Sequence, residues 1–454
     1  STVAGVGLGL AAALRGGPRR SKLRGATARR IGVGEVPTTP PCPPGPKMKV
    51  VVFGATGYIG KAVVAELAQR GHTVYAFTRP NSGIGGKQSL DDVKEAYAKL
   101  GDVQVVTGDV TSQASIQSVM DSVKPDAAVC CLASRTGGRQ DSFDVDYQST
   151  MNTHGAAKAS GLKHFVMLSA VCVQRPLLAF QEAKLKAEAE IRESGGDLPY
   201  SIVQPTAFFK SLLGQLAGVK GGRPYVMFGD GTQVRCKPIS EQDLAGFISD
   251  CLWDEKKRNR TLPIGGPGPA LCFREIGEEI HRNLGREPKF LFIPFSIFDI
   301  IQAPLDFLTG LLPEQLADAA EYGRIGRYYA EQSMLVLNKE TDTYAPELTP
   351  SYGKTSLPEF LRLALEPGSD VLEKQKMGVP QASNMLSMLV GLSDLQKSLG
   401  LAPAPPAPAP VEVEEVAKEK EKEKDKKEKA KGKRKASPSA SSSRSAKKKE
   451  RQRE

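Results

Sequence analysis

Three glycines spaced three residues apart form the part of this sequence that most directly predicts chemistry. The run Lys49-Val-Val-Val-Phe-Gly-Ala-Thr-Gly-Tyr-Ile-Gly60 leads from an apolar strand into this triplet, and residues 61–70 continue as an amphipathic helix. Such a turn lets the backbone approach a dinucleotide pyrophosphate, and the free N–H groups at the helix start attract its charge. An ordinary strand-to-helix turn is the alternative. The pattern predicts a dinucleotide site that includes Gly54, Thr56, Gly57, Tyr58, Ile59 and Gly60.

The charge after the second expected strand, residues 73–78, indicates which dinucleotide binds. A site for NAD usually places an acid about 20 residues after the glycines, where it holds the ribose hydroxyls. Here no acid lies between Glu66 and Asp91, and Arg79 follows the strand directly. A guanidinium can pair with a 2′-phosphate at two points, so the sequence favours NADPH. A solvated surface charge is the alternative role for Arg79.

Further strands, expected at residues 103–106, 127–132, 165–169 and 200–205, must position this site. Their alternation with helical segments predicts an α/β fold, a doubly wound parallel Rossmann sheet with a ligand crevice at the carboxyl ends of its strands. After residue 205 the alternation loosens, which predicts a smaller C-terminal substrate lobe over the crevice. The remaining cofactor contacts are expected at Asp109, which can accept from the adenine amino group, and at Val110, Leu132, Ser134 and Pro205.

Charge and composition divide the chain into four parts. The net charge of +11 lies in the ends, because residues 50–400 carry 36 basic and 40 acidic side chains, and no nucleic-acid partner is expected. The Arg-rich, acid-poor leader resembles an organellar transit peptide, with a basic disordered arm as the alternative. The parts are 1–48, leader and Pro-rich linker; 49–367, Rossmann domain with the substrate lobe mainly at 206–236 and 262–367; 368–401, a short amphipathic extension; and 402–454, a Lys/Glu/Ser-rich tail expected to be disordered.

The most apolar stretch of the chain is residues 290–312. Pro294, Asp299, Pro304 and Asp306 interrupt it, so it is too broken to span a bilayer. It suits the core together with the wall of an apolar cleft, or a surface helix that rests on a membrane. Peripheral membrane contact therefore stays open as an expectation.

Neither the cysteines nor the histidines predict a metal site. The seven cysteines lack zinc-like spacing, and a reduced compartment suits them. Cys130 and Cys131 are consecutive on an apolar strand and should point to opposite faces of the sheet. None of the four histidines is assigned to a site; His72 and His164 precede their strands and so should lie away from the carboxyl-end crevice.

Longer strings of residues carry a resemblance to a known family. The glycine motif and the strand pattern resemble the atypical extended short-chain dehydrogenases/reductases, in the group with NmrA-like proteins and isoflavone reductases. Across residues 50–365 the chain is similar to the family of plant-type divinyl chlorophyllide 8-vinyl-reductases. The strings that carry this closer resemblance are Phe165-Val-Met-Leu-Ser-Ala-Val-Cys-Val-Gln-Arg-Pro-Leu-Leu178, Phe180-Gln-Glu-Ala-Lys-Leu-Lys186, Pro205-Thr-Ala-Phe-Phe-Lys-Ser211, Pro224-Tyr-Val-Met-Phe-Gly-Asp-Gly231 and Lys237-Pro-Ile-Ser-Glu-Gln-Asp-Leu-Ala245.

The resemblance implies catalytic roles for two residues, whereas the third catalytic residue of the superfamily, a tyrosine, is absent here. The serine of the superfamily corresponds to Ser169 and its lysine to Lys184, which would hold the nicotinamide ribose and lend positive charge. The tyrosine four positions before the lysine is replaced by Phe180, which has no proton to give. Hydride addition to a vinyl group conjugated to a macrocycle spreads charge over the ring, so a local acid is less necessary. Ser169 and water remain alternative proton donors.

The implied reaction is reduction of the 8-vinyl group of a divinyl chlorophyllide or protochlorophyllide by NADPH, in the chloroplast. Phe180, Phe208 and Phe209 are expected to line the site of this tetrapyrrole, with plain hydrophobic core as the alternative for the phenylalanine pair. Two rival functions remain: a non-catalytic NADP-binding regulator or assembly factor of the NmrA-like kind, and another alkene reductase of the isoflavone-reductase group.

Overall fold

The computed structural model describes residues 38–39, 45–82, 88–194, 196–311, 313–366 and 369. The expected extension and tail, apart from residue 369, and most of the leader lie outside these residues. The described residues belong to one compact unit.

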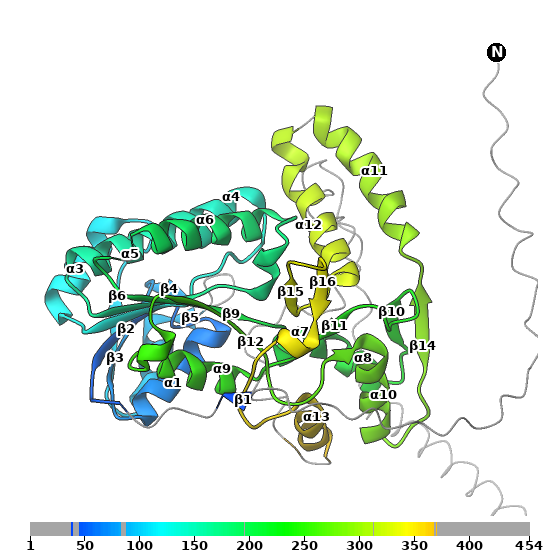
Figure 1. The fold of residues 1–454 in the computed structure, drawn as a ribbon, viewed down its shortest axis with the longest axis horizontal. Coiled ribbons are helices and arrows are strands. Elements are labelled where there is room, and N and C mark those ends of the chain that lie inside the picture. Colours follow the sequence, from blue (N-terminus) through cyan, green and yellow to red (C-terminus); the bar gives the residue numbers. More distant parts are fainter. Residues whose placement is uncertain are drawn as a thin grey trace, which may run out of the picture. The chain divides into compact units, whose positions relative to one another are not determined.

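A seven-stranded, fully parallel sheet forms the centre of the described chain (Figure 1). The chain runs outward from β2 on one side, returns to β7 on the other side, and so reverses direction between these two strands. Ligands bind at such a reversal, outside the carboxyl ends of the strands. In spatial order the strands are β12 (Arg260–Ile264), β9 (Tyr200–Pro205), β8 (His164–Leu168), β7 (Ala127–Cys130), β2 (Lys49–Phe53), β3 (Thr73–Thr78) and β6 (Val103–Thr107).

The expected doubly wound Rossmann sheet is confirmed, and all six strands expected from the sequence are present. The seventh, β12, was not predicted from the sequence because Pro263 interrupts its short apolar run. Proline removes a ladder hydrogen bond and is tolerated at the edge of a sheet, which is where β12 lies.

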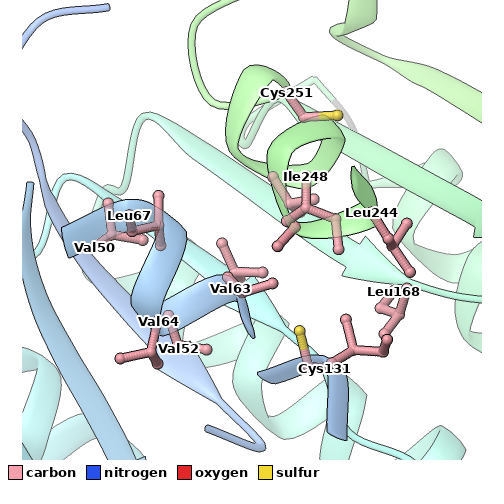
Figure 2. Packing of buried hydrophobic residues seen from close by; sticks show 14 of the residues in the cluster. Val50, Val52, Val63, Val64, Leu67, Cys131, Leu168, Leu244, Ile248 and Cys251 are labelled. Atoms are coloured by element: carbon pink, nitrogen blue, oxygen red, sulfur yellow. The ribbon is translucent and has the colours of Figure 1, made fainter. Parts of the chain in front are cut away.

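Helices cover both faces of the sheet, and alternate residues of each strand pack against them. Val50 and Val52 lie in one apolar cluster, and Val51 and Phe53 lie in another. Figure 2 shows the first cluster, in which β2 packs against helices on that face. These helices are α1 (Tyr58–Gln69), α2 (Leu90–Ala98) and α9 (Glu241–Asp250); the other face carries α3 (Gln113–Val123), α5 (Thr150–Ala159) and α6 (Ala179–Glu193).

The loop after β7 leads into a continuous helical segment of unusual geometry. A short α4 (Arg139–Asp141) passes into η2 (Ser142–Ser149), which is a π-helix, and then into α5. π-Helical turns are rare and often lie at functional sites. This segment packs directly on α6.

The second half of the chain builds the expected smaller lobe around a separate apolar cluster. Its strands pair in twos: β10 with β14 in parallel, and β11 with β13 and β15 with β16 antiparallel. Two small pairs stand apart, β1 with β17 and β4 with β5. The bounds are β1 (Thr38–Thr39), β4 (Asn81–Ser82), β5 (Gln88–Ser89), η3 (Val171–Gln174), α7 (Phe209–Leu212), η4 (Leu213–Gln215), α8 (Leu216–Lys220), β10 (Tyr225–Phe228), β11 (Arg235–Cys236), η5 (Glu255–Lys257), β13 (Leu271–Cys272), α10 (Phe273–Asn283), β14 (Phe290–Ile293), α11 (Ser296–Leu311), α12 (Pro313–Glu331), β15 (Val336–Asn338), β16 (Thr343–Ala345), η6 (Pro346–Leu348), β17 (Ser351–Tyr352) and α13 (Leu357–Leu365).

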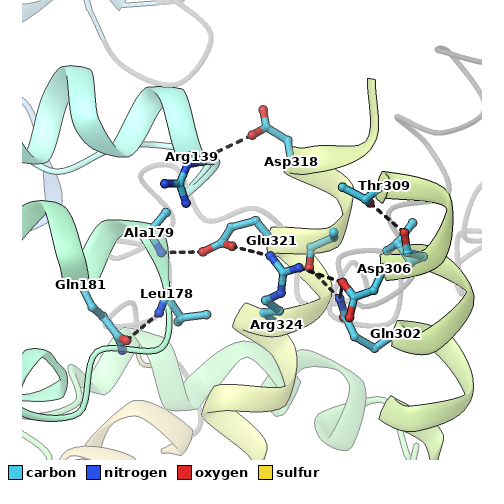
Figure 3. A network of polar contacts seen from close by, with 12 residues as sticks. Arg139, Leu178, Ala179, Gln181, Gln302, Asp306, Thr309, Asp318, Glu321 and Arg324 are labelled. Carbon is cyan, nitrogen blue, oxygen red and sulfur yellow. Dashed lines mark hydrogen bonds and ion pairs between the residues drawn. The ribbon is translucent and has the colours of Figure 1, made fainter. Parts of the chain in front are cut away.

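Carboxylates of α12 hold this lobe against the Rossmann part (Figure 3). Glu321 Oε1 accepts from the backbone N–H of Ala179 at 2.6 Å, and Asp318 Oδ1 accepts from that of Arg139 at 3.0 Å. Both N–H groups belong to the first residue of a helix, where a negative charge is favourable. The start of α6, which carries Phe180, is thereby fixed by the lobe.

Candidate active site

The glycine turn has the geometry that a pyrophosphate site requires. Gly54 adopts a φ of +72°, and a Cβ there would lie 2.6 Å from the Cys131 carbonyl oxygen. A Cβ on Gly60 would lie 2.1 Å from the Gly54 carbonyl oxygen. No side chain of the described residues caps the start of α1 at Gly57, and its first turn carries no acid. The N–H groups there are free to bind an anion, so the residues fit a dinucleotide.

The side chain of Tyr58 is held by α9. Its hydroxyl donates to Glu241 Oε2 at 2.5 Å, and burial together with Glu241 raises the pKa of Tyr58. The Phe208 ring lies edge-on to Tyr58, with centroids 6.0 Å apart. Contact between Tyr58 and a dinucleotide would therefore be made through its backbone.

Two arginines lie near the expected adenosine end. Arg79 is exposed directly after β3. Burial and the positive charge of Arg79 lower the pKa of Arg135, so each arginine feels the charge of the other. Such a pair suits a phosphate. Arg135 was not predicted from the sequence, although its position directly after Ser134 was a signal.

Asp109 and Val110 form a tight turn after β6. The Asp109 carboxylate is exposed and accepts from the backbone N–H of Thr111 at 2.9 Å. Asn152 of α5 donates its side-chain amide to the carbonyl oxygens of Val110 and Thr111, each at 3.1 Å. The Asp109 side chain is thus exposed, as adenine recognition would need, and Asn152 supports the turn that carries it.

A buried ion pair connects Lys184 of α6 with the loop after β7. Lys184 Nζ lies 2.9 Å from Asp146 Oδ1, and both side chains are almost fully buried. The ammonium also donates to the carbonyl oxygens of Leu132 and Leu168 at 3.3 and 3.5 Å. Asp146 Oδ2 accepts from the backbone N–H of Ser134 at 3.2 Å. The expected contacts Leu132, Ser134 and Lys184 are thus brought together by a residue that the sequence did not indicate.

A second buried carboxylate engages Ser169. The Ser169 hydroxyl donates to Glu188 Oε1 at 2.5 Å, and Gln204 Nε2 donates to both oxygens of Glu188 at 2.9 and 3.1 Å. Arg192 Nη1 lies 3.0 Å from Glu188 Oε2. Glu188 was also not predicted, although it stands four residues after Lys184 and so on the same face of α6.

The expected substrate-lining phenylalanines have different environments. Phe180 is partly buried and packs against the lobe cluster. Phe208 is partly buried beside Tyr58, close to the glycine turn. Phe209 is fully buried within the lobe cluster, with its ring 5.2 Å from that of Phe360, and so belongs to the core rather than to a cleft wall. Pro205 ends β9 and pairs with Ile264.

The histidines and cysteines of the described residues have structural surroundings. His72 Nδ1 accepts from the Met48 N–H, and His164 Nε2 bonds with Ser201. His154 packs edge-on against Phe165. No cluster of three potential metal ligands occurs within the described ranges. Cys130 and Cys131 lie in the clusters on opposite faces of the sheet, as their consecutive positions predict.

Strand β14 and helix α11, which contain the stretch 290–311, carry a set of exposed apolar side chains. No helix in the described part of the chain combines the length and apolar character needed to cross a bilayer. Ile300 and Phe307 are nevertheless 68% and 71% exposed. The exposed apolar residues of these two elements, called the apolar patch below, are Leu291, Phe292, Ile300, Phe307 and Leu308.

Comparisons with known proteins give a consistent result. The NAD(P)H-binding domain family matches residues 54–255. The chain is 51% identical to a divinyl chlorophyllide a 8-vinyl-reductase of Zea mays over 372 residues, which cover 78% of this chain and 92% of that protein. An Arabidopsis thaliana protein of the same name is 48% identical over 77% of this chain and 85% of its own length.

Solved structures resemble the fold at low sequence identity. The complex of leucoanthocyanidin reductase with NADPH from Vitis vinifera superposes with a TM-score of 0.51 at 16% identity, covering 70% of this chain and 100% of that one. An isoflavone reductase superposes with a TM-score of 0.50 at 18% identity, covering 70% and 99%. These likenesses concern the fold alone.

Proposed function

This chain belongs to the family of the divinyl chlorophyllide a 8-vinyl-reductases, and we propose that it reduces the 8-vinyl group of a divinyl chlorophyllide or protochlorophyllide to an ethyl group with NADPH. The observation that carries this function is the identity of 51% with the Zea mays reductase across 92% of that protein. The relatives are named chloroplastic, so the protein acts in the chloroplast, in agreement with the transit-peptide character of residues 1–48.

The residues of the glycine turn fit the cofactor. The free N–H groups at the start of α1 would hold the pyrophosphate, and Arg79 with Arg135 would hold the 2′-phosphate. Lys184 would bind the nicotinamide ribose, as the superfamily resemblance implies. Bound NADPH supplies the hydride. The protein then has to place the vinyl carbon about 3–3.5 Å from the nicotinamide and exclude water.

The donors near the reacting position are committed to buried carboxylates. Lys184 pairs with Asp146, and Ser169 donates to Glu188. Phe180 supplies no hydroxyl. Reduction of a ketone would leave charge on one oxygen and call for an acid beside it, whereas a vinyl group conjugated to a tetrapyrrole spreads the charge. The arrangement therefore suits an alkene conjugated to a macrocycle, with water as the proton source.

The test is turnover of the purified protein with NADPH and divinyl chlorophyllide. We expect the monovinyl product, detected by a blue shift of its Soret band and by chromatography. Binding of NADPH without any product from divinyl tetrapyrroles would instead favour a non-catalytic NADP-binding regulator. Turnover of a different conjugated alkene alone would favour another reductase of the isoflavone-reductase group.

We further propose that the apolar patch rests on a plastid membrane. The acids of α11 are paired with basic side chains: Asp299 with Arg327 and Asp306 with Arg324, both on α12. Beside β14, the exposed Arg286 and Lys289 flank a single acid, Glu287. Exposed apolar side chains whose neighbouring acids are paired, with basic residues close by, suit a lipid surface better than free solution. A macrocyclic substrate that partitions into lipid would reach the enzyme there.

Vesicle flotation tests the membrane proposal. We expect Phe307→Asp to weaken binding of the full chain to plastid-lipid vesicles about tenfold, because it removes an exposed phenyl ring that would enter the lipid and adds a charge. Leu348→Asp is the matched control, since Leu348 is also exposed but lies on η6 outside the patch. Equal binding of both variants and the parent would contradict the proposal.

A further inference from the structure

The π-helix η2 lies against the face of α6 that carries Lys184. Such wide turns are rare and often lie at functional sites. Here Ser149 Oγ donates to the carbonyl oxygen of Asp144 at 2.8 Å, five residues earlier. Thr150 Oγ1 makes the corresponding bond to Val145 at 3.5 Å. Two side-chain hydroxyls thus bond to carbonyl oxygens of the widened turn.

Side chains on successive positions of η2 bind α6. Tyr147 donates its hydroxyl to Glu190 Oε1 at 2.7 Å, and Lys186 Nζ lies 4.0 Å from the centre of the Tyr147 ring. The preceding residue, Asp146, pairs with Lys184. The π-helix is therefore docked on α6 with Asp146 directed at the ammonium group.

Asp146 makes two contacts that belong to different parts of the site. Oδ1 pairs with Lys184, whereas Oδ2 accepts from the backbone N–H of Ser134, at the point where the cofactor is expected to cross the sheet. An ammonium buried to this extent is costly unless a counter-charge neutralises it. One carboxylate thus both compensates the buried charge and fixes the loop after β7.

We infer that Asp146 is the positioning residue of the cofactor site, which keeps the Lys184 ammonium charged and holds it in register with the Ser134 backbone. The inference rests on the proposed function only in that NADPH is taken as the ligand. Its test therefore measures NADPH binding rather than turnover, so failure of the vinyl reductase assay and failure of this inference can be told apart.

The charges around Lys184 predict how loss of Asp146 would appear. Burial alone would lower the pKa of Lys184, but the adjacent Asp146, with smaller contributions from the Cys130 and Cys172 thiols, raises it instead. Glu188, one turn further along α6, is already bonded by Ser169 and Gln204. Without Asp146 burial dominates, and the ammonium should lose its proton at a lower pH.

The experiment compares NADPH dissociation constants by fluorescence from about pH 7 to about pH 9. The variants are Asp146→Asn and, as matched control, Asp144→Asn, an exposed carboxylate of the same π-helix that binds Gln140. We expect the parent and Asp144→Asn to bind with a flat pH profile. Asp146→Asn should bind about tenfold more weakly at the low end and lose further affinity as the pH rises. A flat profile for Asp146→Asn would overturn the inference.

A double variant keeps the test decisive if Asp146→Asn does not fold. Asp146→Leu with Lys184→Met removes both charges, and replacing a buried ion pair with apolar residues is often neutral or stabilising. We expect a melting temperature close to that of the parent with weak NADPH binding that does not vary with pH. Binding of NADPH at parental affinity would show that the charged pair is dispensable and would contradict the inference.

Discussion

The two ends of the candidate site treat their polar groups in opposite ways. At the phosphate end, the N–H groups at the start of α1 lack a capping side chain from the described residues, and Arg79 is exposed without an ion pair within them. At the reacting end, Lys184 and Ser169 are each bonded to a buried carboxylate. The first end would gain its partners from a ligand, whereas the donors of the second already have partners within the protein.

This difference indicates how the work of the site is divided. Unpaired donors give binding energy to an anionic ligand when it arrives. Donors already committed to Asp146 and Glu188 have little to offer a substrate, but they fix the geometry around the nicotinamide position. The larger share of the NADPH affinity should thus come from the phosphate end, whereas the reacting end mainly aligns the nicotinamide.

The largest effect should follow from Gly60→Ala, which changes the backbone of the phosphate end. Its Cβ would lie 2.1 Å from the Gly54 carbonyl oxygen, so α1 must move away from β2. We expect NADPH affinity to fall about 1,000-fold, because the backbone contacts to the pyrophosphate are lost together, with a lower melting temperature. Gly218→Ala is the control, since its Cβ meets Arg223 at an ordinary 3.5 Å. An unchanged NADPH affinity in calorimetry would show that the glycine turn does not bind the cofactor.

Arg79→Asp should have the next largest effect, and it tests the contribution of a single positive charge at the phosphate end. We expect NADPH to bind about 100-fold more weakly and NADH to change little, because only NADPH carries the 2′-phosphate. Lys99→Asp, an exposed residue of the same charge that pairs with Glu95, controls for net charge. Equal losses for both cofactors in titrations would show that Arg79 has no selective role.

Phe180→Tyr should have the smallest effect, and it tests the reacting end. We expect kcat to stay within about twofold of the parent, because the reaction does not depend on a phenol at this position. The conservative variant Phe180→Leu reports separately on packing against the lobe cluster. A gain approaching the hundredfold that a well-placed general acid can provide would reveal that a missing acid limits the enzyme.

The sheet and the glycine turn could be predicted because local patterns encode them. Buried parallel strands are continuous apolar runs, and Gly54 and Gly60 are required by close backbone approaches within a few residues. β12 escaped prediction because an edge strand tolerates Pro263, which breaks the pattern. The local sequence therefore predicts the central strands and the glycine turn, but not the edge strand β12.

The reacting end could be predicted only in part, because tertiary contacts decide it. Lys184 and Ser169 were expected, but the carboxylates that bind them were not. Asp146 reaches Lys184 through a π-helical turn, whose widened register no ordinary helical spacing predicts. Phe208 and Phe209 are consecutive and of the same type, so the sequence does not distinguish them. In the fold, the ring of Phe208 is half-buried beside Tyr58, whereas that of Phe209 is buried in the core.

Turnover with NADPH that carries deuterium at the transferable C4 position tests the central claim most directly. The account predicts monovinyl chlorophyllide whose new ethyl group contains one deuterium from the cofactor, with its second added hydrogen taken from water. A product without cofactor-derived deuterium, or tight NADPH binding with no product at all, would contradict it.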